Sequence, residues 1–182
     1  MESITALILA AGEGKRMKSD KAKVLHQVCG KPMIEWVYEA ARDAGVGKCV
    51  IIVGHKAEQV MEHMGDRAEY VMQEQRLGTG HAVQQARSYM EDEGYILILY
   101  GDTPLITSET IKKAMDCMLD EKLDAVVISA DVEDPSGYGR IVRNPDGSFK
   151  RIVEHRDASP AEREIKEINS GMYIFKAREL AD

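Results

Sequence analysis

The sequence predicts an α/β fold with a mostly parallel central sheet, helices on both faces and an added β-hairpin. Continuous apolar runs such as Ile4–Leu9 and Tyr95–Tyr100 are typical of strands that are covered on both faces. Segments with apolar residues at helical spacing separate these runs, so strands and helices alternate along the first part of the chain. Later, the turn residues Asn144-Pro145-Asp146-Gly147 indicate a hairpin.

The elements of the first part follow one another in a regular order. Five runs are expected to form strands of the sheet: Ile4–Leu9, 49–53, Glu69–Met72, Tyr95–Tyr100 and 125–130. Four segments between them are expected to be helices: 32–44, Ala57–Met64, 79–90 and a helix capped by Thr107 or Ser108. Pro32 suits the first turn of its helix and Gly45 suits its end, while Thr79 can cap the third helix. The fourth helix carries an apolar stripe of Ile111, Ala114, Met115, Met118 and Leu119.

The pattern changes beyond Val132, where shorter elements follow. Residues 140–142 and Phe149–Val153 flank the turn and are expected to form the hairpin. Residues 160–167 predict a short polar helix, and residues 172–175 predict a final strand. A helix that begins at Ala177 has little room before Asp182, so we expect the chain to be a fragment that is incomplete at its C-terminal end.

Composition excludes several classes of function. The chain of 182 residues has 24 Lys and Arg against 31 Asp and Glu, a formal net charge of −7. It lacks the broad basic surface that general nucleic-acid binding needs, so we expect no nucleic-acid partner. No apolar run approaches the roughly 20 residues that cross a bilayer, and no basic region precedes the first strand, so we expect no membrane partner and no signal peptide. Three widely spaced cysteines, Cys29, Cys49 and Cys117, predict reduced thiols in a cytoplasmic protein.

The residues after the first strand form a candidate anion site. The run Leu9-Ala10-Ala11-Gly12-Glu13-Gly14 is small enough for backbone N–H groups to approach a ligand. Five cations follow within nine positions: Lys15, Arg16, Lys18, Lys21 and Lys23. The glycines alone favour an ordinary β–α turn, but together with the cations they favour a phosphate site. Met17 stands where the third glycine of a dinucleotide fingerprint belongs.

Asp102 is a candidate metal ligand. It follows the strand Tyr95–Tyr100 in the run Tyr100-Gly101-Asp102-Thr103-Pro104. Open α/β sheets bind ligands at the carboxyl ends of their strands, and one carboxylate together with phosphate oxygens can hold Mg²⁺. A carboxylate that caps the turn before Pro104 explains this position equally well.

Two weaker sets of residues could contact a base and a sugar. Gln73 with Gly78 and Thr79 could read the edge of a planar base, although a surface glutamine beside a helix cap is the simpler interpretation. Gly139, Glu154 and Asn169 would suit sugar hydroxyls, although turn glycines and a solvated glutamate would give the same pattern.

The histidines indicate no further site. His26, His55, His63, His81 and His155 show no pairing at metal-ligand spacing, and we expect surface positions for all five. No Gly-x-Ser-x-Gly motif occurs, so nucleophilic hydrolase chemistry has no support.

In this order the motifs resemble a known family. The first loop with Arg16-Met17 and Lys23-Val24-Leu25 resembles that of the sugar-nucleotide pyrophosphorylases. Further residues narrow the resemblance to the uridyltransferase domain of bifunctional N-acetylglucosamine-1-phosphate uridyltransferase/glucosamine-1-phosphate acetyltransferases. They are Gln73 and five runs: Gly78-Thr79-Gly80-His81-Ala82, Tyr100-Gly101-Asp102, Gly137-Tyr138-Gly139-Arg140-Ile141, Ile152-Val153-Glu154-His155 and Glu167-Ile168-Asn169-Ser170-Gly171. The resemblance implies a three-layer α/β/α Rossmann-like nucleotidyltransferase fold over residues 1–182. Full-length relatives form homotrimers through a β-helix acetyltransferase domain that is absent from this sequence.

The resemblance also implies a reaction and a role for each motif. UTP and N-acetylglucosamine 1-phosphate would give UDP-N-acetylglucosamine, a precursor of peptidoglycan and lipopolysaccharide, and pyrophosphate, with Mg²⁺ as cofactor. Arg16 and Lys23 would neutralise the triphosphate, and Asp102 would bind the metal. The residues implied to hold the uridine are Leu9, Ala10, Ala11, Gly12, Gln73, Gly78 and Thr79. Tyr100 and Gly101 would line the site, and Gly139, Glu154 and Asn169 would hold the amino sugar.

Several departures from the family keep alternatives open. Lys15 stands where threonine is usual, and Ala22 where many relatives have proline. Relatives also supply an asparagine metal ligand and more of the sugar pocket from beyond residue 182. A nucleotide-binding fragment without turnover, and a nucleotidyltransferase for another base or sugar phosphate, therefore remain alternatives. A NAD-binding domain is disfavoured by Met17 and by the absence of an acid after the second strand.

Overall fold

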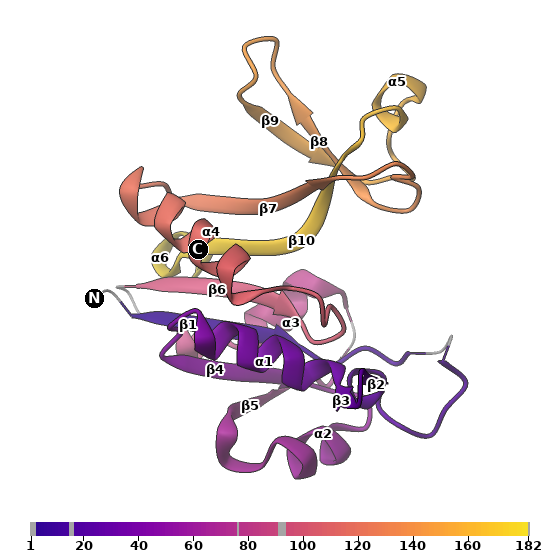
Figure 1. The fold of residues 1–182 in the computed structure, drawn as a ribbon, viewed down its shortest axis with the longest axis vertical. Coiled ribbons are helices and arrows are strands. Elements are labelled where there is room, and N and C mark those ends of the chain that lie inside the picture. Colours follow the sequence, from indigo (N-terminus) through magenta and orange to yellow (C-terminus); the bar gives the residue numbers. More distant parts are fainter. Residues whose placement is uncertain (1–2, 15–16, 76, 91–93, 182) are drawn as a thin grey trace. The chain divides into compact units, whose positions relative to one another are not determined.

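The computed structural model describes residues 3–14, 17–75, 77–90 and 94–181 (Figure 1). The chain divides into two compact units. Unit 1 comprises Met1–Val126 and Tyr173–Asp182, and unit 2 comprises Val127–Met172. The predicted change of pattern after Val132 lies close to the start of unit 2.

A parallel sheet forms the centre of unit 1. Its strands β1 (Ile4–Leu9), β4 (Lys48–Val53), β5 (Glu69–Met72) and β6 (Tyr95–Tyr100) lie in the order β5-β4-β1-β6. All three neighbouring pairs are parallel. The last residues of β10 (Glu167–Lys176) add an antiparallel strand, with Tyr173 opposite Ile98. The predicted mostly parallel sheet is therefore confirmed.

Helices cover both faces of this sheet. On one face, α3 (Thr79–Gln85) and α6 (Ala177–Ala181) supply residues to a buried cluster that includes Leu7, Val50 and Ile96. Figure 1 shows α1 (Met33–Asp43) in front of the strands and α3 behind them. Helix α1 also packs against α4 (Ser108–Asp120). Because successive side chains of a strand point to opposite faces, a sheet covered on both sides needs apolar residues at every position.

Local sequence explains where two of the helices begin or end. After α1, Gly45 has φ +96°, its N–H donates to the Arg42 carbonyl, and the Val46 N–H donates to the Ala41 carbonyl. These two bonds form a Schellman motif, which only a residue tolerant of positive φ allows. At the start of α4, the Thr107 side chain accepts a hydrogen bond from the Thr110 N–H, as predicted.

The prediction for the third helix was wrong at both ends. Gly78, with φ +104°, is the residue before α3, and Thr79 is the first helical residue without capping it. The helix ends at Gln85, and a 3-10 turn, Arg87–Tyr89, follows in place of further α-helix. The helix starts after Gly78 because that backbone conformation is outside the helical region.

Shorter elements complete unit 1. Helix α2 (Ala57–Met64) has the predicted bounds, and Gly65–Arg67 continues it as a 3-10 turn. A second 3-10 turn, Lys23–Leu25, precedes a small hairpin of β2 (Gln27–Val28) and β3 (Lys31–Pro32). Among the described residues no helix is both long and apolar enough to cross a membrane.

Unit 2 contains the predicted β-hairpin. Strands β8 (Gly139–Arg143) and β9 (Phe149–Val153) are antiparallel, and the Gly147 N–H donates to the Asn144 carbonyl in the turn between them. The first part of β10 pairs with β8, and β7 (Ala125–Asp131) also pairs with β10. Helix α5 (Pro160–Arg163) is shorter than the predicted 160–167: Glu164 is its C-cap, and Glu167 already belongs to β10.

Candidate functional site

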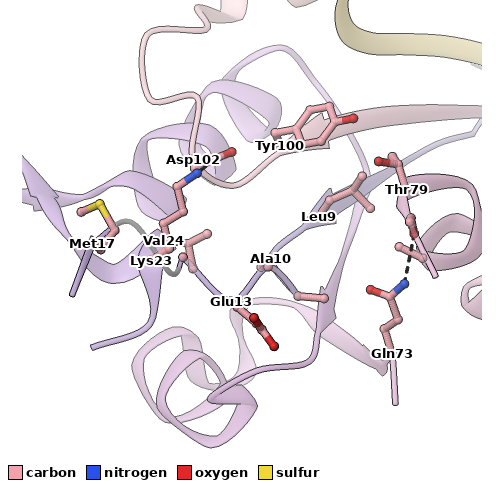
Figure 2. Close-up of a pocket in the computed structure, with 15 residues that line it drawn as sticks. Leu9, Ala10, Glu13, Met17, Lys23, Val24, Gln73, Thr79, Tyr100 and Asp102 are labelled. Atoms are coloured by element: carbon pink, nitrogen blue, oxygen red, sulfur yellow. Dashed lines mark hydrogen bonds and ion pairs between the residues drawn. The ribbon is translucent and has the colours of Figure 1, made fainter. Parts of the chain in front are cut away.

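Unit 1 contains a cavity of about 910 Å³ beside the carboxyl ends of β1, β5 and β6 (Figure 2). This is the edge of the sheet at which open α/β folds bind ligands. The cavity is lined by Leu9, Ala10, Ala11, Gly12, Glu13, Gly14, Met17, Lys23, Val24, Gln73, Gly78, Thr79, Ala82, Tyr100 and Asp102.

Most of the residues implied for the nucleotide lie on this cavity. They are Leu9, Ala10, Ala11, Gly12, Lys23, Gln73, Gly78, Thr79, Tyr100 and Asp102. Arg16 and Lys15 lie outside the described residues. Gly101 is buried beside the cavity rather than among its lining residues, and its N–H donates to the Leu9 carbonyl at 3.0 Å. Gly101 therefore holds the end of β1 in place.

The loop after β1 packs against β4 and Gly54 on one side and is open to the cavity on the other. The Ala10 N–H donates to the Ile52 carbonyl at 2.8 Å, which ties the loop to β4. A Cβ atom at Gly54 would lie 2.9 Å from the Cβ of Ala11, so only glycine fits beneath the loop. A Cβ at Gly12 would meet no atom within 4 Å. This backbone can therefore be approached closely by a ligand on its cavity side.

Lys23 and Asp102 form an ion pair on one side of the cavity. The Lys23 Nζ contacts Asp102 Oδ2, and the side chains are 31% and 27% exposed, respectively. Figure 2 shows this pair across the cavity from Gln73 and Thr79. The cavity thus has a charged side suited to phosphates and a polar side suited to a base.

The donor set at Asp102 fits a magnesium ion. Within the described part of the chain, no three His, Cys, Asp or Glu side chains gather as a metal cage. Mg²⁺ does not need such a cage, because it commonly uses one or two carboxylates together with substrate phosphates and water. Asp102 is a partly exposed carboxylate that forms an ion pair with Lys23. It can therefore supply the carboxylate ligand that such a magnesium site needs.

Gln73 and His81 differ from their predicted environments. Gln73 is only 5% exposed, so the interpretation as a surface glutamine was wrong. Its Nε2 donates to the Gly78 carbonyl at 3.2 Å and lies 3.1 Å from Nδ1 of His81. His81 is half-buried, so the surface position expected for it was also wrong. These contacts depend on the way β5 and α3 meet, which no local pattern encodes.

The residues implied for the sugar lie together in unit 2. Gly139 on β8 pairs with Asn169 on β10. A Cβ atom at Gly139 would lie 3.3 Å from Glu154 Oε1 and 3.4 Å from the Cβ of Asn169. The structure therefore brings these three residues into contact distance within one unit, and glycine keeps the space between them open.

Several further residues of the cavity wall belong to motifs singled out in the sequence but had no individual role there. Glu13, Gly14, Met17, Val24 and Ala82 line it without having been assigned a role. Gly14 already belongs to the predicted anion loop: it has φ +62°, and a Cβ there would lie 2.8 Å from the Cβ of Lys23. Val24 and Ala82 lie within two of the motifs but carry no chemical signal of their own.

Comparison with known proteins places this site in a family. Residues 6–163 match the model of the MobA-like NTP transferase domain. The chain belongs to the MobA-like NTP transferase domain family. This membership, together with the relatives described next, confirms the predicted nucleotidyltransferase class.

Two relatives of this NTP transferase domain are bifunctional GlmU proteins. The chain is 55% identical over 183 residues to the bifunctional protein GlmU of Acetivibrio thermocellus, covering 100% of this chain and 40% of that protein. It is 50% identical to the bifunctional protein GlmU of Caldanaerobacter subterraneus subsp. tengcongensis, covering 99% and 39%. The chain thus spans about 40% of the length of these relatives, and the relationship expected from the motifs is confirmed.

A solved structure shares the fold of this NTP transferase domain. A Bacillus anthracis protein described as a glucose-1-phosphate thymidylyltransferase aligns with a TM-score of 0.82 at 20% identity. The alignment covers 98% of this chain and 74% of that one. It confirms the predicted nucleotidyltransferase-like α/β fold.

Proposed function

We propose that the chain transfers a uridylyl group from UTP to N-acetylglucosamine 1-phosphate, giving UDP-N-acetylglucosamine and pyrophosphate. The observation that carries this proposal is the cavity in unit 1, which has the Lys23–Asp102 pair on one side and the buried amide of Gln73 on the other. The high identity to two GlmU proteins, and the motifs shared with the uridyltransferase family, support this choice of substrates.

The reaction requires two anions to meet. A phosphate oxygen of the sugar phosphate attacks the α-phosphorus of UTP, and pyrophosphate leaves on the opposite side. In this proposal Lys23, together with Arg16, neutralises the phosphates, and the N–H groups of residues 11 and 12 approach them from the loop after β1. The phosphate monoester is already a nucleophile, so no side chain has to act as a nucleophile or general base.

Asp102 is the proposed ligand of Mg²⁺. When bound, Mg²⁺ supplies charge neutralisation at phosphate oxygens and so favours attack on phosphorus. The Asp102 carboxylate lies on the cavity next to the Lys23 ammonium, so the protein places a fixed cation and a metal ligand side by side.

The remaining residues bind and orient the two substrates in this proposal. The uridine lies against Leu9, Ala10, Ala11, Gly12, Gln73, Gly78 and Thr79, beside Tyr100 and Gly101. Gly139, Glu154 and Asn169 of unit 2 hold the amino sugar. By the same resemblance we assign the domain to the cytoplasm. In full-length relatives the same domain would be part of a homotrimer that forms through the β-helix domain.

Pyrophosphate release tests the proposal directly. UTP and N-acetylglucosamine 1-phosphate are supplied with Mg²⁺ or with EDTA, to the wild type, to Asp102→Asn and to the control Asp116→Asn on the exposed face of α4. We expect release that requires Mg²⁺, is lost in Asp102→Asn and persists in Asp116→Asn. Faster release from CTP, GTP or dTTP would overturn the assignment to UTP. Tight UTP binding by folded protein without release would favour the nucleotide-binding alternative.

A further inference from the structure

We propose that His81 fixes the amide of Gln73 so that its carbonyl oxygen is the group offered to a ligand, and that this orientation selects uracil over cytosine. The inference rests on the proposed function and concerns only the base end of the cavity. His81 does not line the cavity, so it is a positioning residue that acts through Gln73.

Gln73 is held firmly at the end of β5. Its N–H donates to the Val53 carbonyl at 2.8 Å, and its side chain is almost fully buried at the cavity wall. A buried amide in such a place cannot swing into solvent. Its remaining freedom is a flip that exchanges the amide nitrogen and oxygen, and these present opposite hydrogen-bonding characters.

The Gly78 carbonyl favours one of the two orientations. It lies 3.2 Å from Gln73 Nε2, as the dashed line in Figure 2 marks. The same carbonyl accepts the first hydrogen bond of α3, from the Ala82 N–H at 3.1 Å, so its position is fixed by the helix. A carbonyl can only accept. The flipped amide would place two oxygens against each other, so Gly78 favours the orientation in which the nitrogen faces it.

His81 engages the second hydrogen of the same nitrogen. Its Nδ1 lies 3.1 Å from Gln73 Nε2, and because Nε2 is a donor there, Nδ1 must carry a lone pair. A neutral ring then carries its hydrogen on Nε2, which lies 3.2 Å from the amide nitrogen Nε2 of Gln85. Gln85 Nε2 also donates to the His81 backbone carbonyl at 3.3 Å. The Gln85 amide is exposed and can turn toward solvent, whereas the Gln73 amide is buried, so Gln73 decides which ring nitrogen of His81 carries the hydrogen. Both hydrogens of Gln73 Nε2 are therefore engaged by protein acceptors.

The fixed orientation gives the cavity wall an acceptor for the base. With its hydrogens engaged, the part of the Gln73 side chain that can meet a ligand is the carbonyl oxygen. Uracil has a hydrogen on its ring N3 and can donate to that oxygen, whereas cytosine has a lone pair on N3. Two facing acceptors leave a buried group unsatisfied, which lowers affinity about tenfold to 100-fold.

Removing the His81 acceptor should relax this choice. Gly78 alone would engage one hydrogen of the Gln73 amide and leave the other unsatisfied. The flipped orientation, in which the amide nitrogen can donate to N3 of cytosine, would then become more accessible. His81→Asn provides a rescue, because its Oδ1 stands close to the position of Nδ1 and can only accept. His63→Leu is the matched control, since His63 lies on α2 and pairs with Glu35.

Calorimetric titration with UTP and CTP in the presence of Mg²⁺ tests the proposal without requiring turnover. We expect the wild type and His63→Leu to bind UTP at least tenfold more tightly than CTP. The ratio should fall about tenfold in His81→Leu and return in His81→Asn. If His81→Leu fails to fold, His81→Met replaces it, because methionine adapts to irregular space.

The possible failures are distinguishable. Wild-type protein that binds neither nucleotide would overturn the proposed function and this inference with it. Wild-type preference for UTP that persists unchanged in folded His81→Leu or His81→Met would overturn the role of His81 alone. A loss of preference in His81→Asn as large as in His81→Leu would also overturn it, because the acceptor would then not be what matters.

Discussion

The cysteines of this chain differ in burial, and burial controls their reactivity. Burial of Cys49 on β4 raises the pKa of its thiol to about 11, whereas Cys29 is exposed in the turn between β2 and β3. The thiolate is the reactive form, so Cys49 is almost entirely unreactive near neutral pH. We expect maleimide at pH 7.5 to label Cys29 within minutes and Cys49 only after unfolding, as mass spectrometry of timed samples would show. Equal labelling rates in the folded protein would contradict this.

Single residues of the site were predictable where the chemistry lies in the residue type. Lys23 and Asp102 were expected to contact ligand from their charge and position, and the structure places both on the cavity. Gln73, His81 and Gly101 could not be placed in the same way. The partners of Gln73 and His81 come from the packing of α3 against the end of β5, and Gly101 packs against Leu9 from a distant part of the chain.

At the scale of elements, the contact between the end of β4 and the loop after β1 is tight. Gly54→Ala would bring its Cβ within 2.9 Å of the Ala11 Cβ and 3.2 Å of the Ala11 backbone oxygen. We expect the loop to be displaced, with a loss of about 1–3 kcal/mol in unfolding free energy and weaker UTP binding. Thermal unfolding and UTP titration would measure both effects.

Gly47→Ala is the control for that substitution. Its Cβ would lie 3.9 Å from the Ile4 carbonyl, an ordinary contact, at the opposite end of β4. We expect little change in stability or in UTP binding. An equal effect of the two substitutions would contradict this account. The loss of stability and of UTP binding would then come from adding a methyl group to β4 or its ends in general, rather than from its contact with the loop after β1.

A second prediction concerns the pairing of strands in unit 2. Glu167 on β10 accepts two hydrogen bonds of 2.7 Å from Arg143 on β8 and one from Ser129 on β7. The hydrogen bond from Arg143 is the main cause that lowers the pKa of Glu167. The folded state therefore prefers the ionised carboxylate, and its contribution to stability is present near neutral pH and lost as pH falls through the lowered pKa.

Glu167→Gln tests this contribution. We expect the variant to be less stable than the wild type by about 1 kcal/mol at pH 7, with the difference shrinking toward pH 3. Urea unfolding at a series of pH values measures it, and Glu62→Gln on the exposed face of α2 controls for loss of one carboxylate. A difference that stays constant with pH would contradict the role of the ionised group.

Element types were predicted more reliably than element ends. Residues 4–9, 57–64, 69–72 and 95–100 have the predicted bounds, because apolar runs and turn residues delimit them. The ends of α3 and α5 were not predictable in the same way. Gly78 takes a conformation outside the helical region, so Thr79 is the first residue of α3 and not its cap. Helix α5 ends at Arg163, and β10 begins at Glu167, the last residue of the predicted helix 160–167.

At the scale of the whole molecule, the parallel sheet of unit 1 provides the main core. Leu7 is fully buried in β1 within the cluster beneath α3. We expect Leu7→Ala to lower the free energy of unfolding by about 2–5 kcal/mol, because it leaves a cavity between strand and helix. Leu105→Ala, at a side chain that is 85% exposed, should change it by less than about 0.5 kcal/mol. Urea denaturation separates the two, and similar losses would contradict this account of the core.

The architecture was predictable from the sequence because the strands of a sheet that is covered on both faces have continuous apolar runs. Apolar residues at every position of Tyr95–Tyr100 fit only a strand buried on both faces, and the alternation with helices makes parallel pairing the simplest arrangement. The division into two compact units was less apparent, since β10 contributes to both. One continuous strand carries no sequence signal at the point where its partners change.

The position of β1 between β4 and β6 has a consequence for protein synthesis. The ribosome makes residues 4–9 long before residues 48–53 and 95–100, which are their only partners within the described sheet. At about 5–20 residues per second, β1 leaves the exit tunnel several seconds before β6 has been translated. During that interval an apolar segment with unpaired edges is exposed on the nascent chain. Folding in the cell therefore depends on how well this segment is shielded until its second neighbour arrives.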